Sequence, residues 1–227
     1  MIRIYETKEW REIKPPLTAH SLTVTSLKFS DDDRYLLSVG RDRQWAIFER
    51  AEGTLGVYKP LTSNPKGHTR MILDGSWASS QAGRIFATAG RDKSVKVWQL
   101  AVTEASCKTT ISAASPVTAV AFHMSAVGKR LMLAYGTEEG AITICLLATS
   151  DLAVAETMTV DRRLLPSRTI NQLTWRPVKH ATAAAYNGNV DDHPPSNQMY
   201  QLAMASDDNS VRVISLSPNP QSTDVKA

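Results

Sequence analysis

The sequence has no long hydrophobic run, and none of its apolar stretches approaches the ~20 residues that a bilayer-spanning helix needs. Its first ten residues, MIRIYETKEW, contain no apolar core of a secretory signal peptide. Only two cysteines are present, Cys107 and Cys145, in separate strand-like segments. We therefore expect two free, buried thiols, an intracellular, reducing compartment and no membrane contact.

The sequence also lacks the common signatures of catalysis. It contains no G-x-S-x-G, P-loop, G-x-G-x-x-G or H-E-x-x-H motif. Three of its histidines, His123, His180 and His193, have no partner at metal-ligand spacing. We predict that the protein is not an enzyme, and that it uses no metal, no cofactor and no small-molecule substrate.

The composition is that of a folded domain. Hydrophobic residues make up 42% of the 227 residues and charged residues 21%, which excludes intrinsic disorder of the whole chain. The formal net charge of +4 predicts only a weak preference for acidic partners.

A thirteen-residue phrase occurs twice, as LLSVGRDRQWAIF at 36–48 and as FATAGRDKSVKVW at 86–98. Weaker copies follow, as GTEEGAITI from Gly136 and SDDNSVRVI from Ser206. Aligned on Asp42, Asp92, Glu138 and Asp208, the copies are 50, 46 and 70 residues apart. The last separation contains the segment 178–198, whose Ala, Asn, Asp, Gly and Pro content is typical of a surface loop. Such recurrence indicates a stacked structural unit.

Each copy lies within a set of short strand patterns. The segments VTSLKFS, ILDGSWA, VTAVAFH and INQLTWR alternate and place Phe29, Trp77, Phe122 and Trp175 at one register. A second strand follows, whose residues show no polar face, and then the turn with the acidic residue. After the turn come a third strand and a weaker candidate for a fourth strand, such as CKTTISA. Four antiparallel strands per unit are typical of β-propeller blades, whereas two separate sandwiches would leave the recurring turn unexplained.

We therefore predict an all-β fold, a β-propeller of about four four-stranded antiparallel blades. Because IRIYE aligns with VKVWQ, we expect residues 1–17 to be the third strand and following strand of a truncated blade. Blades are predicted at 18–62, 63–112, 113–160 and 161–217, the last with the loop insert 178–198, and 218–227 as a disordered tail. This organisation predicts an incomplete, open arc of a seven-bladed ring, with exposed strand edges at both ends.

The second unit resembles a WD40 repeat, through Gly67-His68, Thr88, Asp92 and Trp98. In that family the His, Ser or Thr, Asp and Trp side chains form one hydrogen-bonded network, which fixes the blade. The first unit has Phe48 in place of the tryptophan, and the last two units keep only the acid. The resemblance implies a structural rather than catalytic network of His20, Ser38, Asp42, His68, Thr88, Asp92 and Trp98.

The order of these motifs resembles the family of the second subunit of the Elongator complex. The similarity covers HSLTVTSLKFS, LLSVGRDRQWAIFER, HTRMILDGSWAS, FATAGRDKSVKVW, PVTAVAFH, LTWRP and LAMASDDNSVRVISL. The resemblance implies the C-terminal part of a second propeller, in the cytoplasm and nucleus, with other Elongator subunits as partners. It implies a scaffold that supports tRNA wobble-uridine modification and transcription elongation, while iron–sulfur and acetyl-coenzyme A chemistry belongs to another subunit.

Charged turns form a candidate docking rim. By resemblance they lie together, with a basic half and an acidic half: Arg41, Arg43, Arg70, Arg91 and Lys93, then Glu138, Glu139, Asp207 and Asp208. The pattern favours partners of complementary charge, although solvated charges sorted by chance would look the same. For tRNA the signal is weak, because the basic half is small and has no interleaved aromatic residue.

Two other functions stay open. A WD40 substrate receptor of a ubiquitin ligase often carries a WD-x-R ending on a blade, but here Gln99 and Leu100 follow Trp98. A direct tRNA-binding module would show a steep salt dependence of binding.

Overall fold

The computed structural model describes residues 1–54, 56–124, 131–177, 199–216 and 225–226. Within these residues the strands form four four-stranded antiparallel sheets and one two-stranded sheet. The predicted loop insert 178–198 and most of the predicted tail 218–227 lie outside the described residues. The described part of the chain is therefore all-β and consists of four-stranded blades in an open arrangement.

Each blade is a meander in which consecutive strands pair. The first blade contains β3 (Val24–Phe29), β4 (Tyr35–Gly40), β5 (Trp45–Arg50) and β6 (Tyr58–Asn64). The second contains β7 (Ile72–Trp77), β8 (Ile85–Gly90), β9 (Ser94–Leu100) and β10 (Ala105–Ser112). The third contains β11 (Val117–Met124), β12 (Leu131–Thr137), β13 (Ile142–Leu147) and β14 (Val154–Thr159). The fourth contains β15 (Ile170–Trp175), β16 (Tyr200–Ser206), β17 (Val211–Leu216) and β18 (Val225–Lys226).

The burial of the strands follows from stacking of the blades face to face. Every residue of β4, β8, β12 and β13 is buried, because these middle strands are covered on both faces. The outer strand β10 alternates between half-buried and exposed residues. Two short 3₁₀ helices, η1 (Ser80–Ala82) and η2 (Arg162–Leu164), connect strands.

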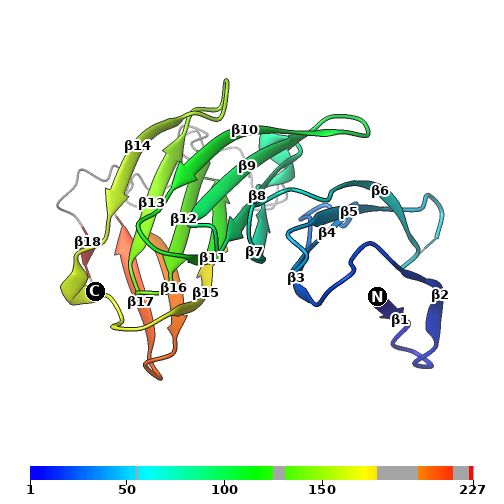
Figure 1. Cartoon of the computed structure of the whole chain (residues 1–227), viewed down its shortest axis with the longest axis horizontal. Helices are drawn as coiled ribbons and strands as arrows, with labels where there is room; N and C mark the ends of the chain where they lie inside the picture. Colours follow the sequence, from blue (N-terminus) through cyan, green and yellow to red (C-terminus); the bar gives the residue numbers. More distant parts are fainter. Residues whose placement is uncertain (55, 125–130, 178–198, 217–224, 227) are drawn as a thin grey trace, which may run out of the picture.

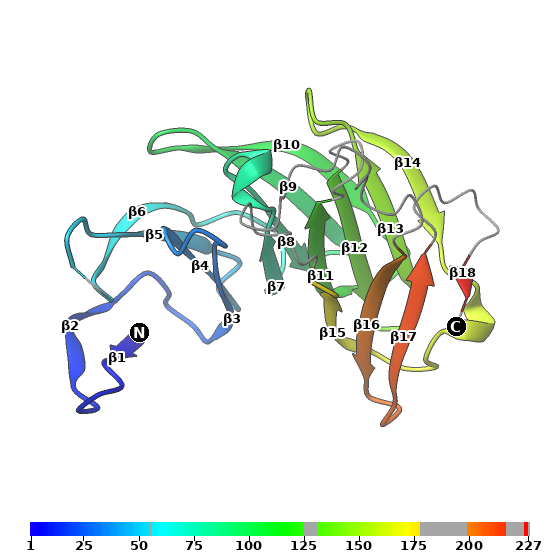
Figure 2. The ribbon, with the colours of Figure 1, turned by 180° about the vertical axis from the view of Figure 1, so that it is seen from behind.

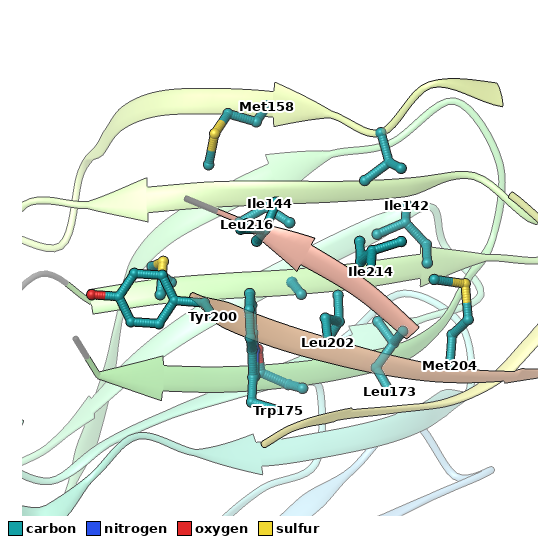
Figure 3. Packing of buried hydrophobic residues seen from close by; sticks show 14 of the residues in the cluster. Ile142, Ile144, Met158, Leu173, Trp175, Tyr200, Leu202, Met204, Ile214 and Leu216 are labelled. Atoms are coloured by element: carbon teal, nitrogen blue, oxygen red, sulfur yellow. The ribbon is translucent and has the colours of Figure 1, made fainter. Parts of the chain in front are cut away.

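Three hydrophobic clusters join successive blades into an arc (Figures 1 and 2). Figure 3 shows the cluster between the third and fourth blades, where Ile142 and Ile144 meet Leu202 and Ile214. The first strands of neighbouring blades, β3, β7, β11 and β15, lie side by side. The two chain ends lie at opposite ends of the arc (Figure 1).

The two-stranded sheet lies beside the first blade. Its strands, β1 (Ile2–Tyr5) and β2 (Glu12–Leu17), pair antiparallel. Ile2 and Leu17 pack against Leu36, Ala46 and Phe48 of the first blade. The predicted range 1–17 thus holds two strands that cover part of the outward face of this blade.

Several details differ from the sequence predictions. Cys145 is buried and free, but Cys107 is free and exposed, because its strand β10 is the outer strand of its blade. Of the predicted disordered tail, Val225–Lys226 are described as a strand that pairs with β17. The strand β6 ends at Asn64, two residues beyond the predicted blade end. Among the described residues, no helix is long and apolar enough to cross a membrane.

Candidate interaction rim

The turns between second and third strands have one geometry in all four blades. In each, an amide of the turn bonds back to the carbonyl three residues earlier, as from Lys93 to Gly90 at 3.2 Å. The donor residue has positive φ in every case: 70° at Arg43, 64° at Lys93, 79° at Gly140 and 63° at Asn209. Glycine and asparagine tolerate this left-handed region well, whereas long side chains adopt it at some cost. The first two blades thus hold basic residues at strained positions.

The second blade contains a closed hydrogen-bonded network. The Trp98 indole Nε1 donates to Thr88 Oγ1 at 2.9 Å, and Thr88 Oγ1 lies 2.7 Å from His68 Nε2. On its other side, His68 Nδ1 lies 3.0 Å from Asp92 Oδ1. Since Thr88 accepts from the indole, its hydroxyl donates to Nε2, and His68 Nδ1–H donates to the carboxylate. The network therefore runs in one direction from indole to carboxylate.

The electrostatics of this network favour a neutral histidine and an ionised aspartate. Burial lowers the pKa of His68, more than Asp92 raises it. Burial alone would raise the pKa of Asp92, but hydrogen bonds from Ser94, His68 and the Thr69 amide hold it at about 2. All polar atoms of the His68 ring are used inside the blade, so this group is not available for acid–base catalysis.

The first blade repeats the arrangement without the indole. His20 Nδ1 lies 3.0 Å from Asp42 Oδ1, and His20 Nε2 lies 2.8 Å from Ser38 Oγ. The Ser38 hydroxyl has the Ala46 carbonyl within 3.4 Å. The position of Trp98 is taken by Phe48, which packs in the cluster beneath β1 and β2. The structure thus brings together all seven residues of the predicted network, three in one blade and four in the next.

The glycines of the GRD turns are required by this packing. A Cβ atom on Gly90 would lie 2.4 Å from His68 Nδ1 and 2.6 Å from Asp92 Oδ1. A Cβ atom on Gly40 would meet His20 and Asp42 at 2.8 Å. The glycine therefore leaves room for the histidine to reach the aspartate.

The third and fourth blades hold their turns differently. In the third, Thr137 Oγ1 accepts from the Ala141 amide at 3.1 Å, and the Glu138 side chain points to Arg91 of the second blade at 3.8 Å. In the fourth, Asp208 Oδ1 accepts from the Ser210 amide at 3.0 Å. The acid at the aligned position thus closes its own turn in the fourth blade but bridges two blades in the third.

The predicted docking residues lie along one edge of the arc. In each blade, the backbone amide of the residue directly after the second strand donates to a backbone carbonyl of the loop that leads into the first strand. These bonds run from Arg41 to Thr23, from Arg91 to Met71, from Glu138 to Pro116 and from Asp207 to Thr169. This recurring bond holds turn and loop at the same edge, and it places Arg70 beside Arg91. We call this edge the rim; it contains Arg41, Arg43, Arg70, Arg91, Lys93, Glu138, Glu139, Asp207 and Asp208.

The acidic half of the rim also contains arginines that the motif alignment missed. Arg162 and Arg168 line an open cavity of about 480 Å³ together with Glu138, Glu139 and Asp207. They come from the loop DRRLLPSR before β15, a basic run that could have been noticed in the sequence. On the basic half the structure adds Lys66, which is exposed beside Gly67. The two halves of the rim therefore differ in net charge. In the basic half the exposed charged side chains are all positive, whereas the acidic half contains both acidic side chains and arginines.

Contacts between blades were not predicted from the sequence. Trp77 Nε1 donates to the Lys28 carbonyl of the first blade at 3.1 Å, and Trp175 Nε1 donates to the Ala121 carbonyl of the third at 3.1 Å. Across the same two interfaces, Thr25 and Thr118 donate to carbonyls of the next blade. Two of the four aromatic residues at the shared register, Trp77 and Trp175, thus join neighbouring blades.

The interface between the second and third blades uses acceptor side chains instead. Asp74 Oδ2 accepts from the Val120 amide at 3.1 Å, and Ser76 Oγ accepts from the Phe122 amide at 3.0 Å. Asp74 Oδ1 also accepts from Ser26 Oγ of the first blade at 2.9 Å. Burial raises the pKa of Asp74 above its usual value, against the lowering effect of Lys28 and these hydrogen bonds. A single carboxylate therefore connects three blades.

The described residues contain no group of three or more His, Cys, Asp or Glu side chains that could hold a metal ion. At the rim, the polar groups either close turns and blade interfaces or are charged and exposed. Such an arrangement can bind macromolecules through charge and backbone contacts.

Comparison with known proteins agrees with the blade architecture. The family model of the WD domain, G-beta repeat, matches residues 12–49 and 59–99. The chain is 37% identical to Elongator complex protein 2 of Schizosaccharomyces pombe over 95% of its length, and 37% identical to that of Saccharomyces cerevisiae over 89%. It is 34% identical to Elongator complex protein 2 of Arabidopsis thaliana over 93%. The chain spans about a quarter of the length of these relatives, 26%, 26% and 25%.

Proposed function

Because the chain belongs to the Elongator complex protein 2 family, we propose that it is a non-catalytic scaffold that docks other Elongator subunits. In this role it supports modification of tRNA wobble uridines and, as a separate role, transcription elongation, in the cytoplasm and nucleus. The whole relatives are about four times as long, so this chain would supply one part of the docking surface.

The rim is the observation that carries this proposal. In the first two blades its turns are held by networks whose members are buried or half-buried, while the arginine and lysine side chains of these turns are exposed. Arg43 and Lys93 are held in the left-handed region, a backbone conformation that other residues fill with less strain. A rigid edge with a basic end and a mixed end favours protein partners of matching charge pattern.

The test is capture of partners from cells that express the tagged chain, followed by mass-spectrometric identification. We expect other Elongator subunits in the captured material. Arg41→Glu with Arg43→Glu should reduce their recovery at least about tenfold, which corresponds to about 1.4 kcal/mol of binding free energy. The matched control is Lys59→Glu with Lys108→Glu, which reverses two exposed charges on the outer strands β6 and β10.

Recovery of Elongator subunits that is equal for both double variants would contradict docking by the basic end of the rim. Recovery of no Elongator subunit by the unmodified chain would contradict the scaffold role of this part of the protein.

Direct tRNA binding is a second candidate, favoured by one observation. Arg41, Arg43, Lys66 and Arg70 are exposed, and among the described residues none of them has a carboxylate within 4.0 Å. Neutralising phosphates with these groups would release counterions, with a slope of log K against log salt of about −0.7 to −0.9 per phosphate. A titration of tRNA at several salt concentrations should give a slope of about −2 or steeper; a flat dependence would exclude this function.

A further inference from the structure

The first strands of the four blades, β3, β7, β11 and β15, lie side by side, and residues near their ends line an open cavity of about 310 Å³. The loops of the rim lead into these strands, so the cavity lies at the opposite end of the strands from the rim. Its lining includes residues from the ends of β11 and β15 and from the first two blades: Phe122, His123, Trp175, Arg176, Lys28 and Ser76.

The first strands share one irregularity, which shows which of their residues are equivalent. In β7, β11 and β15 the pairing with the second strand shifts directly after the first residue of the strand. The shift follows Ile72, Val117 and Ile170. Counted from it, Leu173 and Trp175 of the fourth blade are equivalent to Val120 and Phe122 of the third.

In the third blade, the amides at these two positions are bonded by side chains of the preceding blade. The Val120 amide donates to Asp74 Oδ2 at 3.1 Å, and the Phe122 amide donates to Ser76 Oγ at 3.0 Å. The second blade therefore supplies two acceptor side chains, spaced two residues apart on β7.

The amides of Leu173 and Trp175 have the same orientation in the fourth blade. The Arg176 amide donates to the Gln201 carbonyl, on the side of the second strand β16, at 2.8 Å. Because successive residues of an antiparallel strand alternate between hydrogen-bonded and non-hydrogen-bonded pairs, the amides of Trp175 and Leu173 point away from β16. They point toward the third blade, as the amides of the third blade point toward the second.

The third blade has no acceptor side chain at either of the two matching positions. By the shared register, Ala119 and Ala121 stand where the second blade has its aspartate and its serine. Methyl groups cannot accept a hydrogen bond, so no side chain at these positions bonds the two amides. Since Ala121, Leu173 and Trp175 all line the cavity, the place of the missing acceptors is open.

The charges around the cavity also favour an acceptor. Lys28 and Arg176 are the charged residues of its lining, and both are positive. Asp74 lies 3.6 Å from Lys28 Nζ, but its oxygens already accept from the chain itself. His123 adds a ring nitrogen, Nε2, that is buried without a hydrogen-bond partner among the described residues. The cavity thus holds more donors and positive charge than acceptors.

We propose that this cavity is a docking site for an extended acidic segment of a partner protein. The segment carries Asp or Glu at one position and Ser, Thr, Asp or Glu two residues later. These side chains accept from the Leu173 and Trp175 amides, as the side chains of β7 accept in the third blade, and Lys28 and Arg176 balance the carboxylate charge. The site is separate from the rim and does not depend on the function proposed above.

The test uses a labelled peptide of valine and threonine, blocked at both ends, that carries Asp and Ser two positions apart. The control peptide has alanine at both positions. Fluorescence anisotropy should show that the control binds the protein at least about tenfold more weakly, a difference of about 1.4 kcal/mol. The Asp–Ser peptide should slow amide exchange at Leu173 and Trp175 at least about tenfold. Equal binding of the two peptides would overturn the proposal.

One substitution supplies the missing acceptor from the chain itself. Ala121→Ser places a hydroxyl at the position equivalent to Ser76 Oγ, so it should slow exchange of the Trp175 amide without peptide and weaken peptide binding at least about fivefold. Arg176→Glu should weaken binding at least about tenfold, whereas Lys108→Glu, an exposed reversal on the outer strand β10, should leave it unchanged. Melting curves check that all three variants are folded.

Three outcomes would contradict the proposal. The first is unchanged binding and exchange in Ala121→Ser, or equal losses from Arg176→Glu and Lys108→Glu. The second is slow exchange of the Leu173 and Trp175 amides in the free protein, because these amides would then already be bonded within the chain. The third is protection of both amides by millimolar inorganic phosphate equal to that by the peptide, which would make the cavity a small-anion site.

Discussion

At the scale of single residues, we expect a large effect on stability from a change at Asp92. Asp92→Ala removes the acceptor of His68 Nδ1, the Thr69 amide and the Ser94 amide. Leaving these donors without a partner should lower the free energy of unfolding by roughly 2–4 kcal/mol. Urea unfolding followed by tryptophan fluorescence measures the change.

Glu138→Ala is the matched control, because among the described residues its side chain makes a single ion pair, an exposed one with Arg91 at 3.8 Å. It should cost no more than about 1 kcal/mol. Equal losses for the two variants would show that the network in the second blade contributes nothing beyond the turn itself.

Histidines make stability depend on pH. Burial lowers the pKa of His123 to about 4, and it lowers that of His68. Because the unfolded chain takes up these protons first, stability is fully present above about pH 6.5 and falls as the pH is lowered toward 4. For the partly exposed His123 we expect a loss of about 1–2 kcal/mol after allowing for solvent screening.

Thermal unfolding between pH 4 and 7.5 checks this dependence. His123→Phe keeps the ring contacts with Trp175 and Tyr200 and should flatten the profile. A profile of the variant that is parallel to that of the unmodified chain would assign the dependence to other groups.

At the scale of strands and blades, Asp74 connects neighbours. Asp74→Leu should cost roughly 2–4 kcal/mol, because the Val120 amide loses its acceptor inside the protein. Asp74→Asn keeps an oxygen for this amide and should cost about half as much or less. Denaturant unfolding of both variants measures the difference, and equal costs would show that the carboxylate charge, not the acceptor, matters.

The structure within a blade could be predicted from the sequence because its determinants are local. Alternating apolar and polar residues in INQLTW indicate a strand with one face covered. A continuous apolar run in RIFATAG indicates a strand with both faces covered. The spacing of His68, Thr88 and Asp92 reports a network that one blade closes by itself. The exposure of Cys107 was missed, because it depends on the position of β10 as the outer strand of its blade, where five of its eight residues are exposed.

The contacts between blades could not be predicted, because they depend on how one sheet is placed on the next. Thr25 donates to the Ile72 carbonyl and Asp74 accepts from the Val120 amide, so each contact joins a side chain to a backbone group. Because a backbone carbonyl is present in every residue type, the sequence does not indicate which residue is the partner. The roles of Arg162 and Arg168 at the rim were missed for a similar reason, since a loop outside the aligned motif supplies them.

At the scale of the whole molecule, the arc predicts an order of local stability. The second and third blades have a full blade on each side, whereas the first and fourth have one full neighbour each among the described strands. In a stacked array, stability comes from both neighbours. Amide exchange should therefore be slowest in β8, β12 and β13 and at least about tenfold faster in β3 and β17. Uniform exchange would show that the arc opens only as one unit.

The hydrogen bond from Thr25 to the Ile72 carbonyl spans 47 residues of sequence, which bears on synthesis as well as on the finished fold. On the ribosome, the first blade emerges complete but cannot bury its second face until the next blade has left the exit tunnel. At about 5–20 residues per second, this interval lasts roughly 2–10 s. During it, Tyr35, Leu37 and Ile47 are exposed to solvent, and this nascent surface is where we expect a chaperone to bind.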